Sequence, residues 1–475
     1  MEHALSGTIS EVVNEVNMKN LDSSRRVAVT GIGVVSALGG ALDSFWQACR
    51  EGRSGLRENP AASPLPVATI APAAEFTGKI QDFGPLDDVK KKAIRKGSKL
   101  MAREIQMGVA AAQLALQSAQ TRDFYPSRRF GVSFASDYVV TTPQELTDAV
   151  AACRVSKEGV SSLDLNEWPL KGLTKMTPLW QLKYLTNMSA SHITIYNALY
   201  GPAYDVTNRE ASFGAALAEA VETIKRGAAD AMIVGATGTR LQSYRFVDAY
   251  KYGEISEEAL RANGGKGVVP CRPFDARRCG SIPGEGAAAL VIESVDSARE
   301  RGATIYAEVL GGVYRASIRH ASDLGGVGRS LASNRESLRE AYATSLRAIV
   351  AKFGIRPEEI GHINAAARGD ANLDAAEALA LRDVFGDACD SIPVVSLSGH
   401  IGNPGAGCGA IQTVASILAL ENDELFPTLG YEEPDESFRV NVSREGGVKP
   451  GASFLKLCGN TLGQTSAVYL RKYVG

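Results

Sequence analysis

Residues 26–39, RVAVTGIGVVSALG, decide how the fold of this chain begins. β-Branched residues cluster at the start of this stretch and are followed by Gly31 and Gly33, which predicts a buried β-strand that enters a glycine turn. A helix is expected next, over residues 41–51. Residues 1–25 form an N-terminal extension, in which apolar residues at helical spacing predict either a short amphipathic helix or a mobile tail.

The alternation of strand and helix patterns continues to the end of the chain. Segments with a strand pattern are residues 128–136, 204–208, 229–235, the end of 270–294, 303–312, 362–366 and 393–397. Segments with a helix pattern are residues 99–118, with Ser98 as a possible N-cap, 211–224, 334–353, 374–384 and 410–420. This order predicts an α/β protein with sheets covered on both faces. It also predicts two halves of similar architecture, residues 26–297 and 298–475.

The composition limits the classes of partner and compartment. The 475 residues are 45% hydrophobic and 22% charged, so the chain can bury a large core without disulfides or metals. The net charge is −2 and no basic run stands out, which argues against nucleic acid or an anionic membrane as a partner. Seven scattered cysteines, no secretory signal pattern and no apolar stretch of membrane-spanning length predict a cytoplasmic protein.

Several common motifs are incomplete in this chain. Gly31-x-Gly33 lacks the third glycine of a dinucleotide fingerprint, since Ser36 takes its place. The stretch GNPGAGCG at 402–409 lacks the Lys-Ser/Thr ending of a P-loop, so close backbone packing is the better interpretation. Ser212 is not in a Gly-x-Ser-x-Gly elbow, and no histidine pair has zinc-protease spacing. Nucleotide, hydrolase and metal chemistry are therefore not expected.

Five segments in order resemble the β-ketoacyl synthase family, the condensing enzymes of fatty acid and polyketide synthesis. They are RRVAVTGIGVVSALG (25–39), TNMSASHITIYNALYGPAYDVTN (186–208), CRPFDARRCGSIPGEGAAALVIES (271–294), EEIGHINAAARGDANLDAAEALAL (358–381) and VVSLSGHIGNPGAG (394–407). The resemblance implies a thiolase-type fold, in which two similar βα halves stack in five layers (αβαβα). It also implies a dimer and an active site at the N-terminus of the helix that follows residues 204–208.

The resemblance does not extend to most of the catalytic residues. The chain has Glu210 at the position of the family's nucleophilic cysteine. It has Ala366 at the position of the first histidine and Val395 at the position of the lysine. Only the second histidine is kept, as His400. The glycine-rich loop that closes the family's site is also altered, at residues 458–463. The residues expected to line the substrate pocket are Ala366, Arg368, Val395 and Phe213.

These changes predict that the chain alone does not perform Claisen condensation. A thiolate normally attacks the acyl thioester and holds the acyl group, and a carboxylate is a far poorer nucleophile for this step. Losing one of two donors that stabilise the enolate can cost about 100- to 1000-fold in rate. Glu210 lies at the start of a buried helix, which favours its charge, and Arg368 is expected to form an ion pair with it across the pocket.

Two functions follow from the resemblance. In the first, the chain is a non-catalytic partner similar to chain-length factors, which pairs with a cysteine-bearing ketosynthase and shapes the acyl tunnel. In the second, Glu210 and His400 form an acid/base pair for decarboxylation, cyclisation or acyl transfer. The chain would then form either a homodimer or a heterodimer with a catalytic ketosynthase. Both imply a carrier protein and an acyl chain on its phosphopantetheine as substrate, with no other cofactor. Burial would raise the pKa of Glu210 and Arg368 would lower it, and the sequence leaves the sign open.

Overall fold

The computed structural model describes residues 25–475 apart from 61–62, 64, 122–123, 138–140, 158, 256–267 and 318–333. The helix predicted in the N-terminal extension therefore lies outside the described residues. Within them, no helix combines the length and apolar character needed to cross a membrane.

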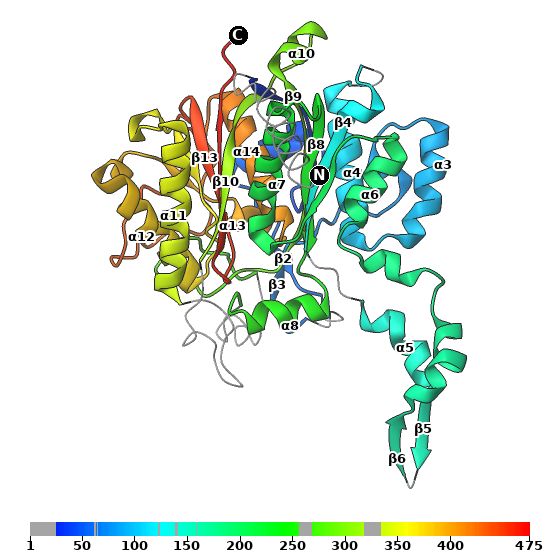
Figure 1. Cartoon of the computed structure of the whole chain (residues 1–475). Helices are drawn as coiled ribbons and strands as arrows, with labels where there is room; N and C mark the ends of the chain where they lie inside the picture. Colours follow the sequence, from blue (N-terminus) through cyan, green and yellow to red (C-terminus); the bar gives the residue numbers. More distant parts are fainter. Residues whose placement is uncertain are drawn as a thin grey trace, which may run out of the picture.

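Both halves of the chain build the same five-stranded arrangement, and the two arrangements join into one ten-stranded sheet (Figure 1). In spatial order from the centre, the first half contributes β1 (Val27–Val35), β9 (Glu285–Ser294), β8 (Ala231–Thr239), β4 (Phe130–Ser136) and β7 (Ala203–Val206). The second half contributes β10 (Ala307–Ala316), β14 (Gln464–Arg471), β13 (Ser453–Gly459), β11 (His362–Asn364) and β12 (Val394–Val395). In each half two antiparallel pairings are followed by two parallel ones.

The helices form three further layers around the two half-sheets. In the middle, α7 (Ser212–Lys225) and α14 (Gly407–Asn422) contact each other and strands of both halves. One outer layer contains α4 (Arg103–Ala119), which packs on β1, β8 and β9, together with α3 (Asp88–Gly97) and α6 (Met188–Asn197). The other outer layer contains α11 (Arg335–Phe353) and α12 (Ala371–Phe385). The predicted five-layer αβαβα fold is confirmed.

The remaining elements are short. The helices are α2 (Leu42–Arg50), α5 (Pro143–Ala152), α8 (Ser243–Lys251), α10 (Val295–Glu300) and α13 (Ser398–Ile401). Two small antiparallel ribbons pair β2 (Arg57–Glu58) with β3 (Thr69–Ile70), and β5 (Arg154–Lys157) with β6 (Val160–Leu163). Single turns of 3-10 helix include η1 (Ile80–Phe83), η2 (Ser98–Leu100) and η8 (Arg209–Ala211).

The predicted glycine turn after the first strand is wrong, because β1 continues through both glycines to Val35. The glycines are needed for the approach of α4. A Cβ atom on Gly31 would lie 2.3 Å from the Ala115 carbonyl oxygen, and one on Gly33 would lie 2.1 Å from that of Ala111. The backbone of the strand thus packs directly on the backbone of the helix.

Replacing Gly33 by alanine is expected to lower the free energy of unfolding by about 1–3 kcal/mol or more, because β1 and α4 would have to move apart. Urea unfolding followed by circular dichroism measures this. Gly302→Asn is the control, since its Cβ meets nothing within 4 Å and asparagine tolerates its positive φ of 67°. Equal stability of the two variants would contradict this account of the glycine.

Two other expectations need correction. The helix predicted from residue 99 begins at Arg103, and Ser98 is not its N-cap: its hydroxyl donates to the Arg95 carbonyl oxygen at the end of α3. The helix α3 itself was not predicted, nor were strands β13 and β14. The interpretation of GNPGAGCG as a close-packing segment is confirmed, because a Cβ on Gly407 would lie 2.3 Å from the Gly286 carbonyl oxygen.

The carboxylate of Glu308 links the start of β1 to the end of β14. Glu308 on β10 accepts a hydrogen bond from Arg26 Nε at 2.8 Å and another from Arg471 Nε at 2.9 Å. The pairing registers agree, since Ala28 and Arg471 are both partners of Glu308 on its two sides. The start of β1 and the end of β14 therefore flank the same residue.

Candidate functional site

Glu210 lies in the turn η8, between the end of β7 and the start of α7. Ser212, the first residue of α7, organises this turn: its hydroxyl accepts a hydrogen bond from the Asn208 backbone N–H at 2.7 Å and donates to the Arg209 carbonyl oxygen at 2.6 Å. Arg209 itself has a positive φ of 53°. The turn places the Glu210 side chain in the interior, with 3% of its surface exposed.

Arg240 is the direct ionic partner of Glu210. Arg240 follows β8 directly, and its Nη2 lies 2.6 Å from Glu210 Oε1. Its Nη1 lies 3.1 Å from the carboxylate of Asp137, which follows β4 in the same way. Because β4 and β8 are adjacent parallel strands, their carboxyl ends bring these two side chains together. Asn403 Nδ2 donates a further hydrogen bond to Glu210 Oε1 at 3.2 Å.

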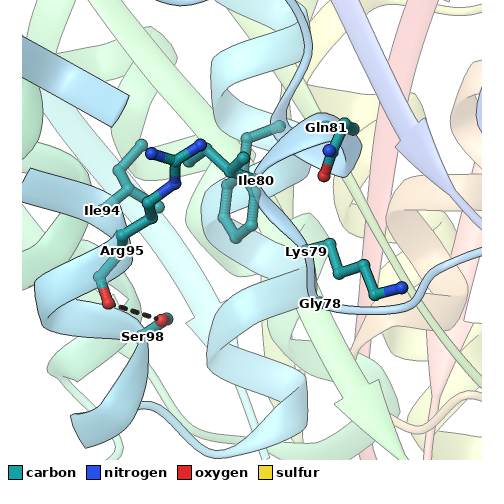
Figure 2. Close-up of a pocket in the computed structure, with 8 residues that line it drawn as sticks. Gly78, Lys79, Ile80, Gln81, Ile94, Arg95 and Ser98 are labelled. Atoms are coloured by element: carbon teal, nitrogen blue, oxygen red, sulfur yellow. Dashed lines mark hydrogen bonds between the residues drawn. The ribbon is translucent and has the colours of Figure 1, made fainter. Parts of the chain in front are cut away.

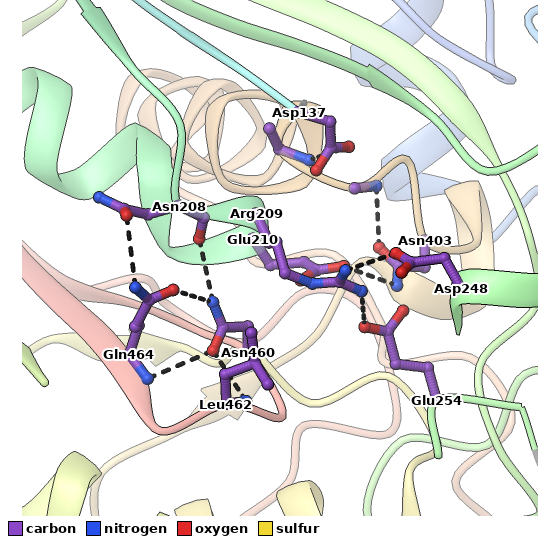
Figure 3. Close-up of polar contacts among 12 residues, drawn as sticks. Asp137, Asn208, Arg209, Glu210, Asp248, Glu254, Asn403, Asn460, Leu462 and Gln464 are labelled. Atoms are coloured by element: carbon purple, nitrogen blue, oxygen red, sulfur yellow. Dashed lines mark hydrogen bonds and ion pairs between the residues drawn. The ribbon is translucent and has the colours of Figure 1, made fainter. Parts of the chain in front are cut away.

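The ion pairs continue from Glu210 to helix α8 (Figure 3). Arg209 binds Asp248 on α8 at 2.6 Å and also contacts Glu254, which lies 3.6 Å from Arg240 Nε. Arg209 also lies over the ring of Tyr252, 4.7 Å from its centroid. The residues joined in this way are called the Glu210 cluster: Asp137, Arg209, Glu210, Arg240, Asp248 and Glu254.

The sequence left open whether the pKa of Glu210 is raised or lowered, and its surroundings in the structure lower it. Burial raises this pKa, but the positive charges of Arg240, Arg368 and Arg209 outweigh burial. They hold the pKa of the Glu210 carboxyl below its usual range. The carboxyl is therefore ionised at neutral pH, and it is a poor general acid.

Glu210→Gln is expected to reduce the acid sensitivity of the fold. A carboxyl with a depressed folded-state pKa stabilises the fold above its unfolded pKa of about 4.3, and this contribution is lost as the pH falls below that value. Urea unfolding at pH 6, 5, 4 and 3 measures the effect. The wild-type chain should lose more stability over this range than Glu210→Gln. Parallel curves for the two proteins would contradict the depressed pKa.

The expected ion pair between Glu210 and Arg368, both of which the structure describes, is not formed: Glu210 pairs with Arg209 and Arg240. Arg368 is buried in the loop after β11, and its Nη1 donates to the Gly459 carbonyl oxygen at 3.1 Å. Its backbone N–H is held by Asp374 at 2.9 Å. Arg368 thus acts on Glu210 through its charge, and Arg240 takes the contact position that sequence reasoning gave to Arg368.

The structure does not bring His400 to Glu210. His400 on α13 is fully buried, its ring lies edge-on to Phe426 with centroids 6.0 Å apart, and burial lowers its pKa to about 4. No hydrogen bond or ion pair joins His400 and Glu210, both of which the structure describes. Gly402 lies between His400 and Asn403 with a positive φ of 64°, and it is Asn403 that reaches Glu210.

The other three residues expected in the pocket are packed into the core. Phe213 on α7 and Val395 on β12 are completely buried, and Ala366 is 5% exposed. The Ala366 backbone N–H donates to Glu377 at 2.7 Å. A Cβ on Gly409 would lie 3.1 Å from that of Phe213, so α7 and α14 are in close contact here.

Sequence reasoning missed a buried lysine beside the same loop. Lys456 on β13 is fully buried, and its Nζ donates to the Ala365 carbonyl oxygen at 2.9 Å and to the side chains of Asn364 and Gln412 at 3.1 and 2.5 Å. Burial lowers its pKa. The signal was a single lysine in the apolar run SFLKLC, and it was missed because this run was not assigned to a strand.

Helix α3 has a basic surface. The expectation that the chain contains no basic run is therefore wrong, because it relied on the net charge of the whole chain. The exposed cations of α3 are Lys92, Arg95, Lys96 and, just beyond the helix, Lys99. Arg95 borders a cavity of about 260 Å³ between α3 and η1 (Figure 2). The cavity is lined by Gly78, Lys79, Ile80, Gln81, Phe83, Ile94, Arg95 and Ser98. None of these residues belongs to the Glu210 cluster.

Two further observations bear on the chemistry of the site. In the part of the chain that the structure describes, no three His, Cys, Asp or Glu side chains are grouped to hold a metal ion. Glu285 is engaged structurally, since it pairs with Arg103 at 2.7 Å and accepts from the Ala73 backbone N–H at 3.1 Å.

Comparison with known proteins identifies the family. The model of the β-ketoacyl synthase N-terminal domain matches residues 24–298, and that of the C-terminal domain matches residues 321–432. The chain is 27% identical to 3-oxoacyl-[acyl-carrier-protein] synthase 2 of Coxiella burnetii, over 89% of this chain and 93% of that protein. It is 30% identical to a protein described as polyketide β-ketoacyl synthase 2 of Streptomyces coelicolor, over 94% and 95% of the two chains.

A solved structure shows the same fold. The ishigamide ketosynthase/chain length factor superposes with a TM-score of 0.75 and 22% identity, over 95% of this chain and 100% of that one. The ordered match to both domain models shows that the chain belongs to the β-ketoacyl synthase family of fatty acid and polyketide biosynthesis.

Proposed function

We propose that this chain is a non-catalytic, chain-length-factor-like subunit that pairs with a cysteine-bearing ketosynthase and helps to shape the tunnel for the growing acyl chain. The observation that carries the proposal is the state of Glu210. The side chain at the nucleophile position is a buried carboxylate whose Oε1 is held by Arg240 and Asn403. A carboxylate held in this way supports packing between the layers and has no use as a nucleophile toward a thioester.

Two observations weigh against an acid/base role for Glu210 and His400. The depressed pKa makes the Glu210 carboxylate a weak base as well as a poor acid at neutral pH. His400 is neutral at the same pH, with a pKa of about 4, and its ring packs against Phe426. General acid/base catalysis needs both groups within hydrogen-bond reach of one substrate, with a pKa near the working pH.

The substrate in this proposal is an acyl chain on the phosphopantetheine of a carrier protein. The Coxiella relative includes the acyl-carrier protein in its name. The exposed cations of α3, Lys92, Arg95 and Lys96, offer an electropositive surface that would attract a partner bearing a phosphate. This chain would then contribute to docking and to the tunnel, while its partner supplies the cysteine and both histidines.

The test has two steps. The tagged full chain is first purified from its native cells, and an equimolar ketosynthase with a cysteine nucleophile is expected in the mass spectrum. Product formation by the purified pair is then assayed with carrier-bound substrates. Glu210→Gln should leave the rate within about 3-fold, because the amide keeps the shape and part of the hydrogen bonding. Alanine at the partner's cysteine should abolish the product.

Either of two results would overturn the proposal. If no other ketosynthase co-purifies with the chain, the proposed partner subunit does not exist. A loss of 100-fold or more on Glu210→Gln, with the variant folded and still paired, would make the carboxylate catalytic. Gln47→Glu on the exposed face of α2 is a matched control for the exchange of amide and carboxylate, and it should leave both steps unchanged.

A further inference from the structure

Residues Asn460–Gly463 connect β13 to β14 and are called the Asn460 turn below. They belong to the altered stretch at the position of the family's glycine-rich closing loop. Strands β13 and β14 both contact η8, the turn that carries Glu210. Figure 3 shows Asn460 and Gln464 facing Asn208, which immediately precedes η8. The Asn460 turn therefore lies directly beside the site.

The side chain of Asn460 fixes the shape of its own turn. Its Oδ1 accepts hydrogen bonds from the backbone N–H groups of Leu462 at 3.0 Å and Gln464 at 3.2 Å. The Gly463 N–H donates to the Asn460 carbonyl oxygen at 3.2 Å, and Gly463 has the positive φ of 81° that this tight turn requires. Asparagine side chains stabilise turns by such bonds to the backbone that follows. These bonds hold the turn in one compact conformation.

The other end of the same side chain joins the turn to η8. Asn460 Nδ2 donates to the Asn208 carbonyl oxygen at 3.0 Å and to Gln464 Oε1 at 2.7 Å. Gln464 Nε2 donates in turn to Asn208 Oδ1 at 3.4 Å. The side chains of Asn208, Asn460 and Gln464 are called the amide lock below. Asn460 is completely buried, and its carboxamide is fully paired, because it donates two hydrogen bonds and accepts two.

Contacts from three other elements hold the same segment. Arg368 Nη1, in the loop after β11, donates to the Gly459 carbonyl oxygen at 3.1 Å. The Gly463 carbonyl oxygen accepts from the Ser317 N–H, just after β10, at 2.9 Å. A Cβ atom on Gly459 would lie 2.2 Å from the hydroxyl oxygen of Tyr342 on α11. Loops that open and close have few buried contacts, so the Asn460 turn belongs to the core.

The surroundings of Glu210 leave no open approach while the turn is in place. Arg240, after β8, and Asn403, after α13, hold Glu210 Oε1 at 2.6 and 3.2 Å. Thr461 in the Asn460 turn is 1% exposed, and Glu210 itself is 3% exposed. A thioester on a pantetheine arm would reach position 210 only after part of this enclosure moved.

We propose that Asn460 is the residue that excludes carrier-bound thioesters from the pocket of this chain, because the amide lock fixes the Asn460 turn as a plug beside Glu210. This inference rests on the proposed function for the nature of the excluded substrate. The growing acyl chain is then received by the partner's cysteine alone. Without the Asn460 carboxamide, the Asn208 carbonyl oxygen and Gln464 Oε1 would lose this donor, and the turn would lose its bond to η8.

The test uses the full chain with a thiol placed at position 210 by Glu210→Cys. The probe is a pantetheine arm that ends in a chloroacetamide group: the thiolate displaces chloride and forms a thioether, which is measured by mass spectrometry of the digested protein. Adding Asn460→Ala or Gln464→Ala should raise the rate of attachment at least about 10-fold, because hydrogen bonds of the lock are lost. Asn422→Ala is the matched control, since Asn422 is an exposed amide at the end of α14 and should leave the rate unchanged.

Two further measurements distinguish a local opening from a general loosening of the fold. Cys49 and Cys389 are completely buried and belong to other parts of the chain, so they should stay unlabelled in every variant. Chloroacetamide without the pantetheine arm needs less room, so its rate at position 210 should rise less than that of the probe.

The outcomes that would overturn the plug are distinct. One is the same rate of attachment with and without the amide lock, whether fast or undetectable. Another is simultaneous labelling of Cys49 and Cys389 in the lock variants, because the whole fold would then open. Neither result affects the proposed function, which fails if no cysteine-bearing ketosynthase pairs with the chain.

Discussion

Replacing Arg240 by methionine is expected to lower the free energy of unfolding by about 3–5 kcal/mol, because removal of one partner from a buried ion pair leaves uncompensated charge. Arg240 is 1% exposed and lies against three carboxylates, those of Asp137, Glu210 and Glu254. Methionine fills a similar volume without the charge. Urea unfolding at pH 7, with the midpoint and slope fitted together, measures the change.

A second variant tests the origin of that loss. Combining Arg240→Met with Glu210→Gln should recover part of the stability, since one of the stranded carboxylates is neutralised, and the double-mutant cycle should show a coupling of at least about 1 kcal/mol. Arg356→Met is the control, because Arg356 is largely exposed and pairs with Glu359 on the surface, where such pairs contribute about 0–1 kcal/mol. A loss at Arg240 no greater than at Arg356 would contradict the account of the cluster.

Glu210→Cys is expected to leave the chain without measurable condensation, at least about 100- to 1000-fold below a condensing member of the family assayed beside it. The reason is that a thiol at position 210 restores one group only. Ala366 supplies no donor for the enolate, and one such donor is worth about 100- to 1000-fold in rate. Products from acyl- and malonyl-carrier protein are followed by mass spectrometry.

The thiol at position 210 must be shown to exist as a reactive group for this result to be informative. Alkylation by iodoacetamide, compared with the wild-type chain, reports how far reagents reach it. Six of the seven native cysteines are buried, so they set a low background. Condensation near the rate of the reference enzyme would contradict the expectation that a side-chain donor is needed at position 366.

Most of the fold could be predicted because its signals are local. Strand and helix periods in segments such as 334–353 and 362–366 correspond to α11 and β11. The errors arose where the structure depends on distant residues. Gly31 and Gly33 suggested a turn, but their role is the close approach of α4, which lies some eighty residues further along the chain.

The site could be predicted only in part, for the same reason. The location of Glu210 before a buried helix follows from the local pattern of residues 204–224. Its partner Arg240 depends on which strands are neighbours, and the strand that ends before it was predicted to stop at residue 235. His400 was expected to act together with Glu210, but the backbone at Gly402, with its positive φ, presents Asn403 to Glu210 in its place.

Arg26 and Arg471 both bind the carboxylate of Glu308, so the first and last residues of the large sheet lie close together in space. A short linker could join residue 471 to residue 26, and new ends could be opened at Gly302, where nothing packs. Such a circular permutant would keep every strand neighbour while exchanging the order of the two halves along the chain. We therefore expect the architecture to depend on which strands are adjacent and not on which half comes first along the chain.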